Sequence, residues 1–461
     1  MAFLQRTMNR GSVSTGYDID NSLKLEQDNT EYLHKTPGSS GNRRTFTLSG
    51  WIKRTEVNRG SGGGDYIFTA GDGDYNQSDR TILKFNHDDT IYWGGGSAYE
   101  LKTNRVFRDT SAWYHIAMIV DTTSGTAGDR LKLYVNGVRE TSFSSSSNPS
   151  QNFDYAFMKD DKQVIGYNHT DSSNPMSAYI AEVLWLDGTA ASITDLGEFD
   201  EDTGIWIPKD VSNLSVGTNG CYLDFEDSSN LGNDASGGTD FTLNNITAAD
   251  QATDTPTNNF ATMNVIWGTD RMPLMSEGAT EFGNNVSAYR YATATMGVTS
   301  GKWYWEIKPT VNGNTLVSGA GIASNQNTLF FYDETGNFVY HYDGDRYVNG
   351  TAVSSYGTAW STNDIIGFAY DADNWTLTCY VNNSSQGNLL ASQTDISSEL
   401  FIPYVYSFGT HTYQSNFGGY TTMSNTHTNT DENGYGLFVY APPSGYYALC
   451  GKNLAEFGGT A

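Results

Sequence analysis

The chain has 461 residues, and its 49 glycines, 30 tyrosines and 22 phenylalanines favour β-strands and turns over long helices. Its 52 acidic and 26 basic side chains give a net charge of -26. A field of this sign repels phosphate backbones, which argues against nucleic acid as a partner. The length suggests two or three domains, each large enough to bury its own core.

Targeting signals and cross-links are not evident in the sequence. Met1–Arg10 lacks the apolar core of a secretory signal, and apolar runs such as Ile116–Val120 are too short to span a bilayer. We therefore expect no membrane insertion. The cysteines match neither a zinc spacing nor a disulfide framework, so we expect them to be reduced and mostly buried. They are Cys221, Cys379 and Cys450.

Alternating apolar and polar residues recur from residue 21 to residue 190, after an N-terminal arm at 1–20. No helical period interrupts them, which predicts a two-sheet antiparallel sandwich. The predicted strands include Ser22–Glu26, Phe46–Ile52, Tyr66–Phe68, Ile82–Phe85, Ile91–Trp93, Trp113–Val120, Leu131–Val135 and Tyr179–Leu186. Asn136-Gly137 follows one strand, and this pair tolerates the positive φ of a tight hairpin turn.

Residues 191–264 are acidic and polar, and they predict a linker that contains one isolated strand at Cys221–Phe225. Alternation returns at 265–417, where Gly301–Ile307, Asp364–Tyr370 and Trp375–Val381 predict a second sandwich, with a turn at Asn382-Asn383. Residues 418–461 are expected to form a loop and a C-terminal tail. The predicted fold class is all-β, with two antiparallel β-sandwiches joined by the acidic linker.

Two short sets of motifs resemble known domain families. The first sandwich resembles the concanavalin A-like, laminin-G-like jelly rolls through Leu48–Lys53, Trp113–Ile116, Leu131–Gly137 and Ile180–Val183. The second resembles a SPRY domain through Gly301–Ile307, Gly319–Ala323 and Asp364–Gly367. These resemblances imply a jelly roll followed by a SPRY-like sandwich.

Nearly the whole chain resembles a family of tailed-phage virion proteins, frequent in marine phages, that join a jelly roll to a SPRY-like domain. The motifs, in order, are Tyr32–Pro37, Gly197–Gly204, Gly217–Phe225, Asp254–Asn259 and Pro442–Tyr446. The resemblance implies a tail-fibre-like or other surface structural protein of the virion. One departure is a polar insertion after Asn416-Phe417-Gly418 that continues to Asn433.

Catalytic patterns are weak. Retaining glycosidases need two carboxylates about 5 to 5.5 Å apart, which a Glu-x-Asp-x-Glu strand would supply. Glu198-x-Asp200-x-Asp202 is the nearest match, but Thr203-Gly204 ends it at once, so we interpret it as a solvated turn. The histidines lie near no nucleophile motif, and His115 is expected to be a structural residue of its strand. We therefore predict that the protein is not an enzyme.

One loop has the residue types of a calcium site. Asp72, Asp74 and Asn76 present oxygen side chains at alternate positions, and Asp79 follows. Such hard oxygen ligands suit Ca²⁺, although the loop lacks the glycine and the bidentate glutamate of an EF-hand. We therefore favour an ordinary Asp/Asn/Gly turn, with a calcium site as the alternative interpretation.

Aromatic side chains in predicted loops are the candidate ligand-binding residues. Trp93 precedes three glycines and Tyr99 lies close to it, so exposed rings there could stack on a sugar. Tyrosines also crowd the predicted loops of the second sandwich, where binding and packing at the rim of the core are both plausible. They are Tyr340, Tyr342, Tyr347 and Tyr356.

These observations together predict a phage virion structural protein, made in the host cytoplasm and located on the virion surface. We expect homo-oligomers, contacts with other virion proteins and recognition of host-surface glycans or neighbouring proteins through sandwich loops. The main alternative is a purely architectural capsid-decoration or tail-assembly protein without a host ligand. A glycan depolymerase is a third hypothesis.

Overall fold

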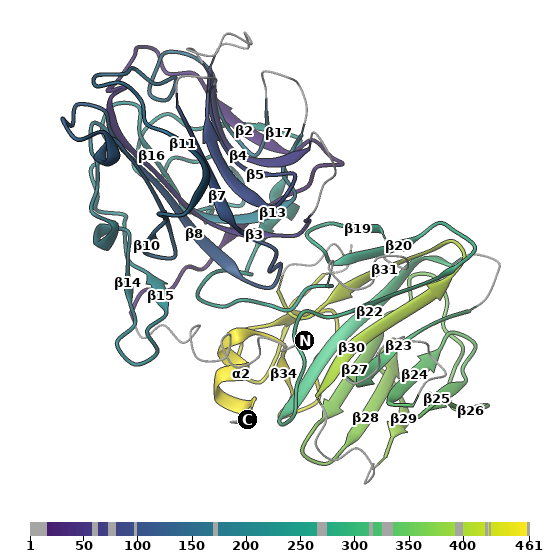
Figure 1. Ribbon diagram of the computed structural model, residues 1–461. Coiled ribbons are helices and arrows are strands. Elements are labelled where there is room, and N and C mark those ends of the chain that lie inside the picture. The colour runs from purple at the N-terminus through teal and green to yellow at the C-terminus, as the bar shows by residue number, and fades with distance from the viewer. Residues whose placement is uncertain are drawn as a thin grey trace. The chain divides into compact units, whose positions relative to one another are not determined.

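The computed structural model describes residues 16–57, 63–71, 80–95, 99–168, 174–264, 274–312, 317–324, 335–391, 400–419, 423 and 426–458 (Figure 1). These residues form two compact units that divide between Thr257 and Asn258. Both units consist mainly of antiparallel sheets, which confirms the all-β class and the two sandwiches.

The first unit contains two eight-stranded sheets and a small hairpin. In spatial order, the first sheet contains β10 (Val138–Arg139), β9 (Leu131–Val135), β8 (Trp113–Asp121), β3 (Thr45–Arg54), β13 (Ala178–Asp187), β1 (Ser22–Leu25) and β18 (Gln251–Ala252), with β16 (Cys221–Leu223) paired to β13. The second contains β11 (Phe143–Ser147), β7 (Glu100–Val106), β6 (Thr90–Gly94), β5 (Arg80–Asn86), β4 (Gly64–Gly71), β12 (Gln163–Ile165), β2 (Tyr32–Lys35) and β17 (Thr242–Asn244). The hairpin contains β14 (Gly197–Phe199) and β15 (Trp206–Pro208).

Side-chain alternation places one apolar core between these two sheets. In β9 the apolar residues are buried and the intervening Lys132 and Tyr134 are only partly so. Phe68 and Trp185, which come from opposite sheets, meet edge to face with ring centroids 5.4 Å apart. The expected turn is also present, because Asn136 and Gly137 both have positive φ, 48° and 74°, between β9 and β10.

The segment predicted as a separate linker, 191–264, belongs mostly to the first sandwich. The strand expected at 221–225 is β16, and it is not isolated because it pairs with β13. β17 and β18 pair with β2 and β1. The acidic side chains also have structural partners: the buried Asp254 lies 2.6 Å from the ammonium of buried Lys53. The boundary at residue 190 was therefore wrong, since composition does not reveal that polar segments complete the sheets.

Three short 3-10 helices also lie in the first unit. They are η1 (Ala127–Asp129), η2 (Ile193–Asp195) and η3 (Ala248–Asp250). η2 and η3 each begin with a capping box, in which the aspartate at the third helical position accepts a hydrogen bond from the N-cap backbone.

The second unit contains a sheet of eight strands, a sheet of six and a short pair. The larger contains β19 (Leu274–Ser276), β20 (Glu281–Asn284), β31 (His411–Asn416), β22 (Lys302–Asn312), β27 (Ile366–Asp371), β28 (Thr376–Val381) and β29 (Ser384–Leu390), with β34 (Tyr447–Ala448) paired to β22. The six-stranded sheet contains β21 (Tyr289–Thr293), β30 (Phe401–Phe408), β23 (Val317–Ser324), β24 (Asn337–His341), β25 (Arg346–Val348) and β26 (Thr351–Val353). The pair is β32 (Asn429–Thr430) and β33 (Leu437–Phe438), and α2 spans Gly451–Phe457.

The core of the second unit is rich in aromatic side chains. Trp305 on β22 stacks on its cross-strand neighbour Phe368, with ring centroids 5.4 Å apart. The predicted turn between β28 and β29 is present, since Asn382 and Asn383 have φ of 47° and 66°. Alternation and turn chemistry therefore predicted this part of the fold correctly.

The described part of 418–458 is ordered on the second sandwich, where the sequence predicted a loop and tail. β34 adds to β22 in parallel, and the buried carboxylate of Glu306 accepts hydrogen bonds from the backbone of Val439 and Tyr440, both at 2.9 Å. Burial raises the pKa of Glu306 despite these hydrogen bonds. The sequence did not show this order, because the apolar residues of the segment, at 437–441 and 446–450, form no alternating run long enough to predict a sandwich strand.

Candidate recognition surfaces

Tyr340 and Tyr356 form an internal brace at one side of the second sandwich. Tyr340 is fully buried and its hydroxyl donates to the carbonyl of Thr358. The ring of Tyr356 stands perpendicular to that of Tyr340, and its hydroxyl donates to the carbonyl of Gly387 at 2.6 Å. Arg346 lies over the Tyr356 ring and donates to the carbonyl of Asn388, so this group joins β25 to β29. The expectation that Tyr340 is available for ligands was wrong, because its ring points into the core.

Tyr342 and Tyr347 instead both pack against the His341 ring and are only partly buried. The His341 ring centroid is 4.7 Å from that of Tyr342 and 5.7 Å from that of Tyr347. The Nδ1 atom of His341 lies 2.7 Å from a carboxylate oxygen of exposed Asp343. Burial acts to raise the pKa of Asp343, but the hydrogen bonds from His341 and from the backbone of Asp345, together with the attraction of His341, outweigh it and the pKa is lowered. We call Tyr342, Tyr347, His341 and Asp343 the His341 group.

The His341 group borders a larger set of aromatic side chains, which we call the tyrosine face. Its residues are Tyr289, Tyr291, Tyr347, Tyr404 and Tyr406. Strand pairing places Tyr291 opposite Tyr406 and Tyr289 opposite Phe408, on neighbouring strands of the six-stranded sheet. Apart from Tyr347, sequence reasoning missed this set, although the repeated Tyr-x-Tyr pattern at 289–291 and 404–406 was a usable signal.

Most of the tyrosine face is itself packed. Tyr404 and Tyr406 are each 1% exposed, whereas Tyr289 and Tyr347 are partly exposed. The accessible aromatic surface is therefore the rim of the tyrosine face together with the His341 group. Aromatic rings beside a hydrogen-bonding carboxylate and imidazole suit recognition of a peptide or a sugar.

Trp93 and Tyr99 are core residues of the first sandwich. They are 0% and 1% exposed, and the Trp93 ring stacks on Phe157 at 5.9 Å. The Tyr99 hydroxyl is 2.8 Å from that of Thr81. The expectation that these rings are exposed was wrong, because Trp93 lies on β6 just before its end at Gly94 and its ring is buried in the core.

Ser49 and His115 form a buried pair that superficially resembles a catalytic dyad. Trp206 Nε1 donates to His115 Nδ1 at 3.1 Å, which leaves the neutral imidazole proton on Nε2. That Nε2 atom therefore donates to Ser49 Oγ, 2.8 Å away, and it cannot take the serine proton. Burial lowers the pKa of His115 to about 3. The pair is a structural one, as the sequence predicted for His115.

Two protein-family models match separate parts of the chain. Residues 27–191 match the concanavalin A-like lectin/glucanases superfamily, and residues 302–420 match the SPRY domain. The chain contains a concanavalin A-like laminin-G domain and a SPRY domain. The resemblances to a laminin-G-like jelly roll and to a SPRY domain are thereby confirmed at the level of the domain. No curated protein matches the chain.

Solved structures also match parts of the chain. The SPRY domain of human HERC1 is 19% identical, with 30% of this chain and 89% of that chain covered and a TM-score of 0.27. The TRIM65 PSpry domain is 12% identical, with 34% and 92% covered and a TM-score of 0.28. A native heptameric SAP-like pentraxin from Limulus polyphemus is 15% identical, with 39% and 82% covered and a TM-score of 0.28.

The predicted calcium ligands of the laminin-G domain, Asp72, Asp74, Asn76 and Asp79, lie outside the described residues. Within the described ranges, no three His, Cys, Asp or Glu side chains gather closely enough to hold a metal ion. The calcium site therefore stays a prediction. Likewise, no helix in the described part of the chain is long and apolar enough to cross a membrane.

The acidic motif of the first unit lies in the β14–β15 hairpin, where Glu198 and Phe199 of β14 are exposed and all of β15 is buried. Asp200 accepts hydrogen bonds from the backbone and hydroxyl of Thr203, at 2.7 and 2.6 Å, which closes a turn. The Glu198 carboxylate lies 3.3 Å from Lys209 Nζ. This is the turn that the sequence predicted, and neither family match singles out a catalytic family.

Proposed function

We propose that the protein is a non-enzymatic recognition component of a tailed-phage virion surface. A laminin-G domain followed by a SPRY domain in one chain supports a binding role, because both domain types bind ligands through loops and sheet rims. The virion assignment rests on the resemblance of motifs from Tyr32–Pro37 to Pro442–Tyr446. On this proposal, homo-oligomers bind host-surface glycans or neighbouring virion proteins by many weak contacts.

The observation that carries the recognition role is the His341 group of the SPRY domain. Its two partly exposed tyrosines offer stiff contact area at low entropic cost, and its Asp343 is an exposed hydrogen-bond acceptor. The brace of Tyr340, Tyr356 and Arg346 holds the adjoining strands, so this surface is preorganised.

The test is binding of fluorescently labelled full-length protein to a panel of bacterial cells. We expect saturable binding to a few related strains, reduced on the order of tenfold in the Y342A/Y347A double variant. Tyr435→Ala is the matched control, since Tyr435 is also an exposed tyrosine of the second unit, 39% exposed, and lies outside the His341 group.

Absence of binding to every strain, by protein shown to be folded and oligomeric, would contradict host recognition and favour the purely architectural role. Equal binding by wild type and Y342A/Y347A would remove the His341 group from the recognition surface.

A further inference from the structure

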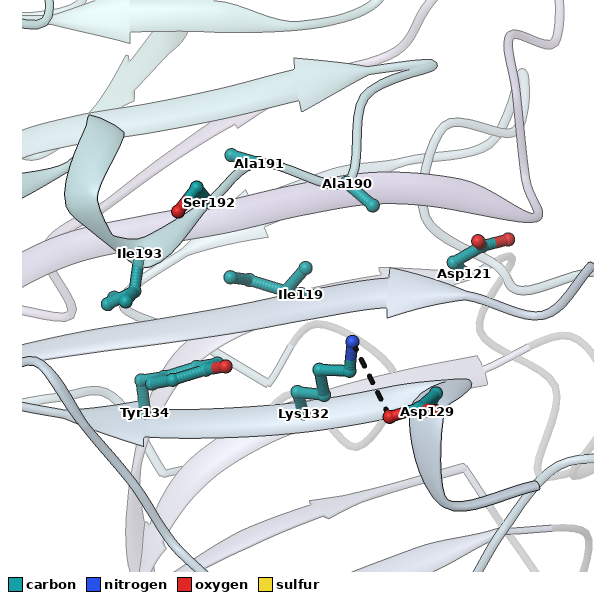
Figure 2. A pocket seen from close by; sticks show the side chains of 9 residues that line it. All are labelled: Ile119, Asp121, Asp129, Lys132, Tyr134, Ala190, Ala191, Ser192 and Ile193. Atoms are coloured by element: carbon teal, nitrogen blue, oxygen red, sulfur yellow. Dashed lines mark ion pairs between the residues drawn. The ribbon is translucent and has the colours of Figure 1, made fainter. Parts of the chain in front are cut away.

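The outer face of the first sheet of the laminin-G domain contains a hollow of about 380 Å³. Strands β8 and β9 form its base, and residues 190–193 form one wall (Figure 2). Its lining residues are Ile119, Asp121, Asp129, Lys132, Tyr134, Ala190, Ala191, Ser192 and Ile193. A hollow of this size falls within the range of small-ligand sites, roughly 300–1,000 Å³.

Strand register explains why these side chains meet. Ile119 on β8 pairs with Lys132 on β9, and Tyr134 lies two residues further along the same strand. Residues two apart on a strand share a face, so Lys132 and Tyr134 both project to this side of the sheet. Tyr134 packs partly against a small apolar cluster that includes Leu184 and Leu196, which fixes its ring beside the hollow.

The polar groups of the hollow retain hydrogen-bonding capacity. One carboxylate oxygen of Asp121 accepts from the backbone and hydroxyl of Thr123, at 3.1 and 2.5 Å, and the other accepts from no described residue. Lys132 Nζ is 3.7 Å from Asp129 Oδ1, which is an ion pair but longer than a hydrogen bond. Acceptors at Asp121 and Asp129 and a donor at Lys132 therefore face the same space (Figure 2).

We propose that this hollow binds one pyranose unit of a glycan that carries no negative charge. The Tyr134 ring would contact the apolar face of the sugar, while Asp121, Asp129 and Lys132 would bind its hydroxyl groups. Lys132 and Arg139 both pair with Asp129, each at 3.7 Å from its Oδ1 atom, whereas Asp121 makes no ion pair with a described residue. The uncompensated charge of Asp121 disfavours an anionic ligand beside it, and the charged groups together disfavour a purely apolar one. The inference rests on the proposed recognition function and supplies its ligand class.

The test is saturation-transfer NMR of the full-length protein with five probes: methyl glucoside, methyl galactoside, methyl mannoside, N-acetylglucosamine and glucuronate. We expect saturable binding of at least one neutral pyranose and none of glucuronate. Tyr134→Phe keeps the ring and should retain binding. Tyr134→Leu and Asp121→Asn should each weaken binding on the order of tenfold.

Asp154→Asn is the matched control, because Asp154 forms an exposed ion pair with Arg44 in the same unit and is not part of the hollow. Melting curves verify that each variant is folded. The inference is overturned if no neutral pyranose binds, if glucuronate binds best, or if Tyr134→Leu and Asp121→Asn bind like wild type. If the protein still binds cells but none of the five probes, only the proposal of sugar binding in the hollow is overturned. If a sugar binds but no cells are bound, only host recognition is overturned.

Discussion

Glu182 is a buried carboxylate of the laminin-G domain, and its position on β13 determines its pKa. It lies inside β13 with a positive φ of 49°, where the pairing with β3 shifts register in a β-bulge. The bulge directs its carboxylate to the hydroxyls of Tyr222, at 2.9 Å, and Tyr17, at 3.2 Å. Burial raises the pKa of Glu182 to about 8, and the tyrosine hydrogen bonds only partly oppose this.

A pH dependence follows from this raised pKa. The unfolded chain loses this proton near the ordinary value of 4.5, so the folded state holds it more tightly and stability falls as pH rises from about 4.5 to about 8. We expect the melting temperature of the first unit to fall over this interval, and to fall less in Glu182→Gln. Glu198→Gln, at an exposed position of β14, is the control. Identical pH profiles for Glu182→Gln and wild type would show that Glu182 does not cause this pH dependence.

The ion pair of Lys53 and Asp254 is the second residue-scale prediction. Both side chains are buried, and Asp254 also accepts from Trp113 Nε1 at 3.0 Å. Asp254→Asn removes the carboxylate that hydrogen-bonds a buried lysine, so we expect a loss of about 3–5 kcal/mol in urea unfolding. Asp154→Asn breaks an exposed pair and should cost about 1 kcal/mol or less. Equal losses in the two variants would refute the structural role of Asp254.

At the scale of the element, strand β23 determines how the tyrosine face packs. β23 lies between β30 and β24, and its Gly319 stands opposite both Tyr406 and His341. A Cβ atom at Gly319 would lie 2.7 Å from Val339 and 2.8 Å from the ring of Tyr406. The absent side chain therefore lets the tyrosine lie across the strand.

Gly319→Ala should destabilise the SPRY domain by about 1–3 kcal/mol, because the added methyl group overpacks the face. The control is Gly283→Ala on β20, where a Cβ would meet Leu274 at an ordinary 3.5 Å and the change should be neutral or slightly stabilising. Urea unfolding monitored by tyrosine and tryptophan fluorescence measures both. An unchanged free energy of unfolding for Gly319→Ala would show that the packing of Tyr406 does not depend on this glycine.

At the scale of the whole molecule, the chain folds as two units whose boundary is not where composition changes. Residues beyond 190 supply β16, β17 and β18 to both sheets of the first unit. Phe241, from the same polar segment, meets Trp185 edge to face at 5.5 Å. The segment after residue 418 likewise belongs to the second unit, because its strand β34 pairs with β22.

Fragments test this division. We expect residues 14–257 to be soluble and to unfold in one cooperative transition, because both sheets are complete. Residues 14–190 should aggregate or melt at a much lower temperature, since β13 loses β16 and the core loses Phe241. Circular dichroism and size-exclusion chromatography measure both. A stable 14–190 fragment would contradict the contribution of 191–257.

The sequence by itself determined the strands, the two Asn-containing hairpin turns and the presence of two separate sandwiches. These depend on short-range chemistry, namely a period of two and residues that tolerate positive φ. Only the tertiary structure decided that Trp93 and Tyr340 are buried and that Tyr342 and Tyr347 meet at His341. Alternation separates the two faces of a strand, but distant segments determine which face is covered and which aromatic rings reach the surface.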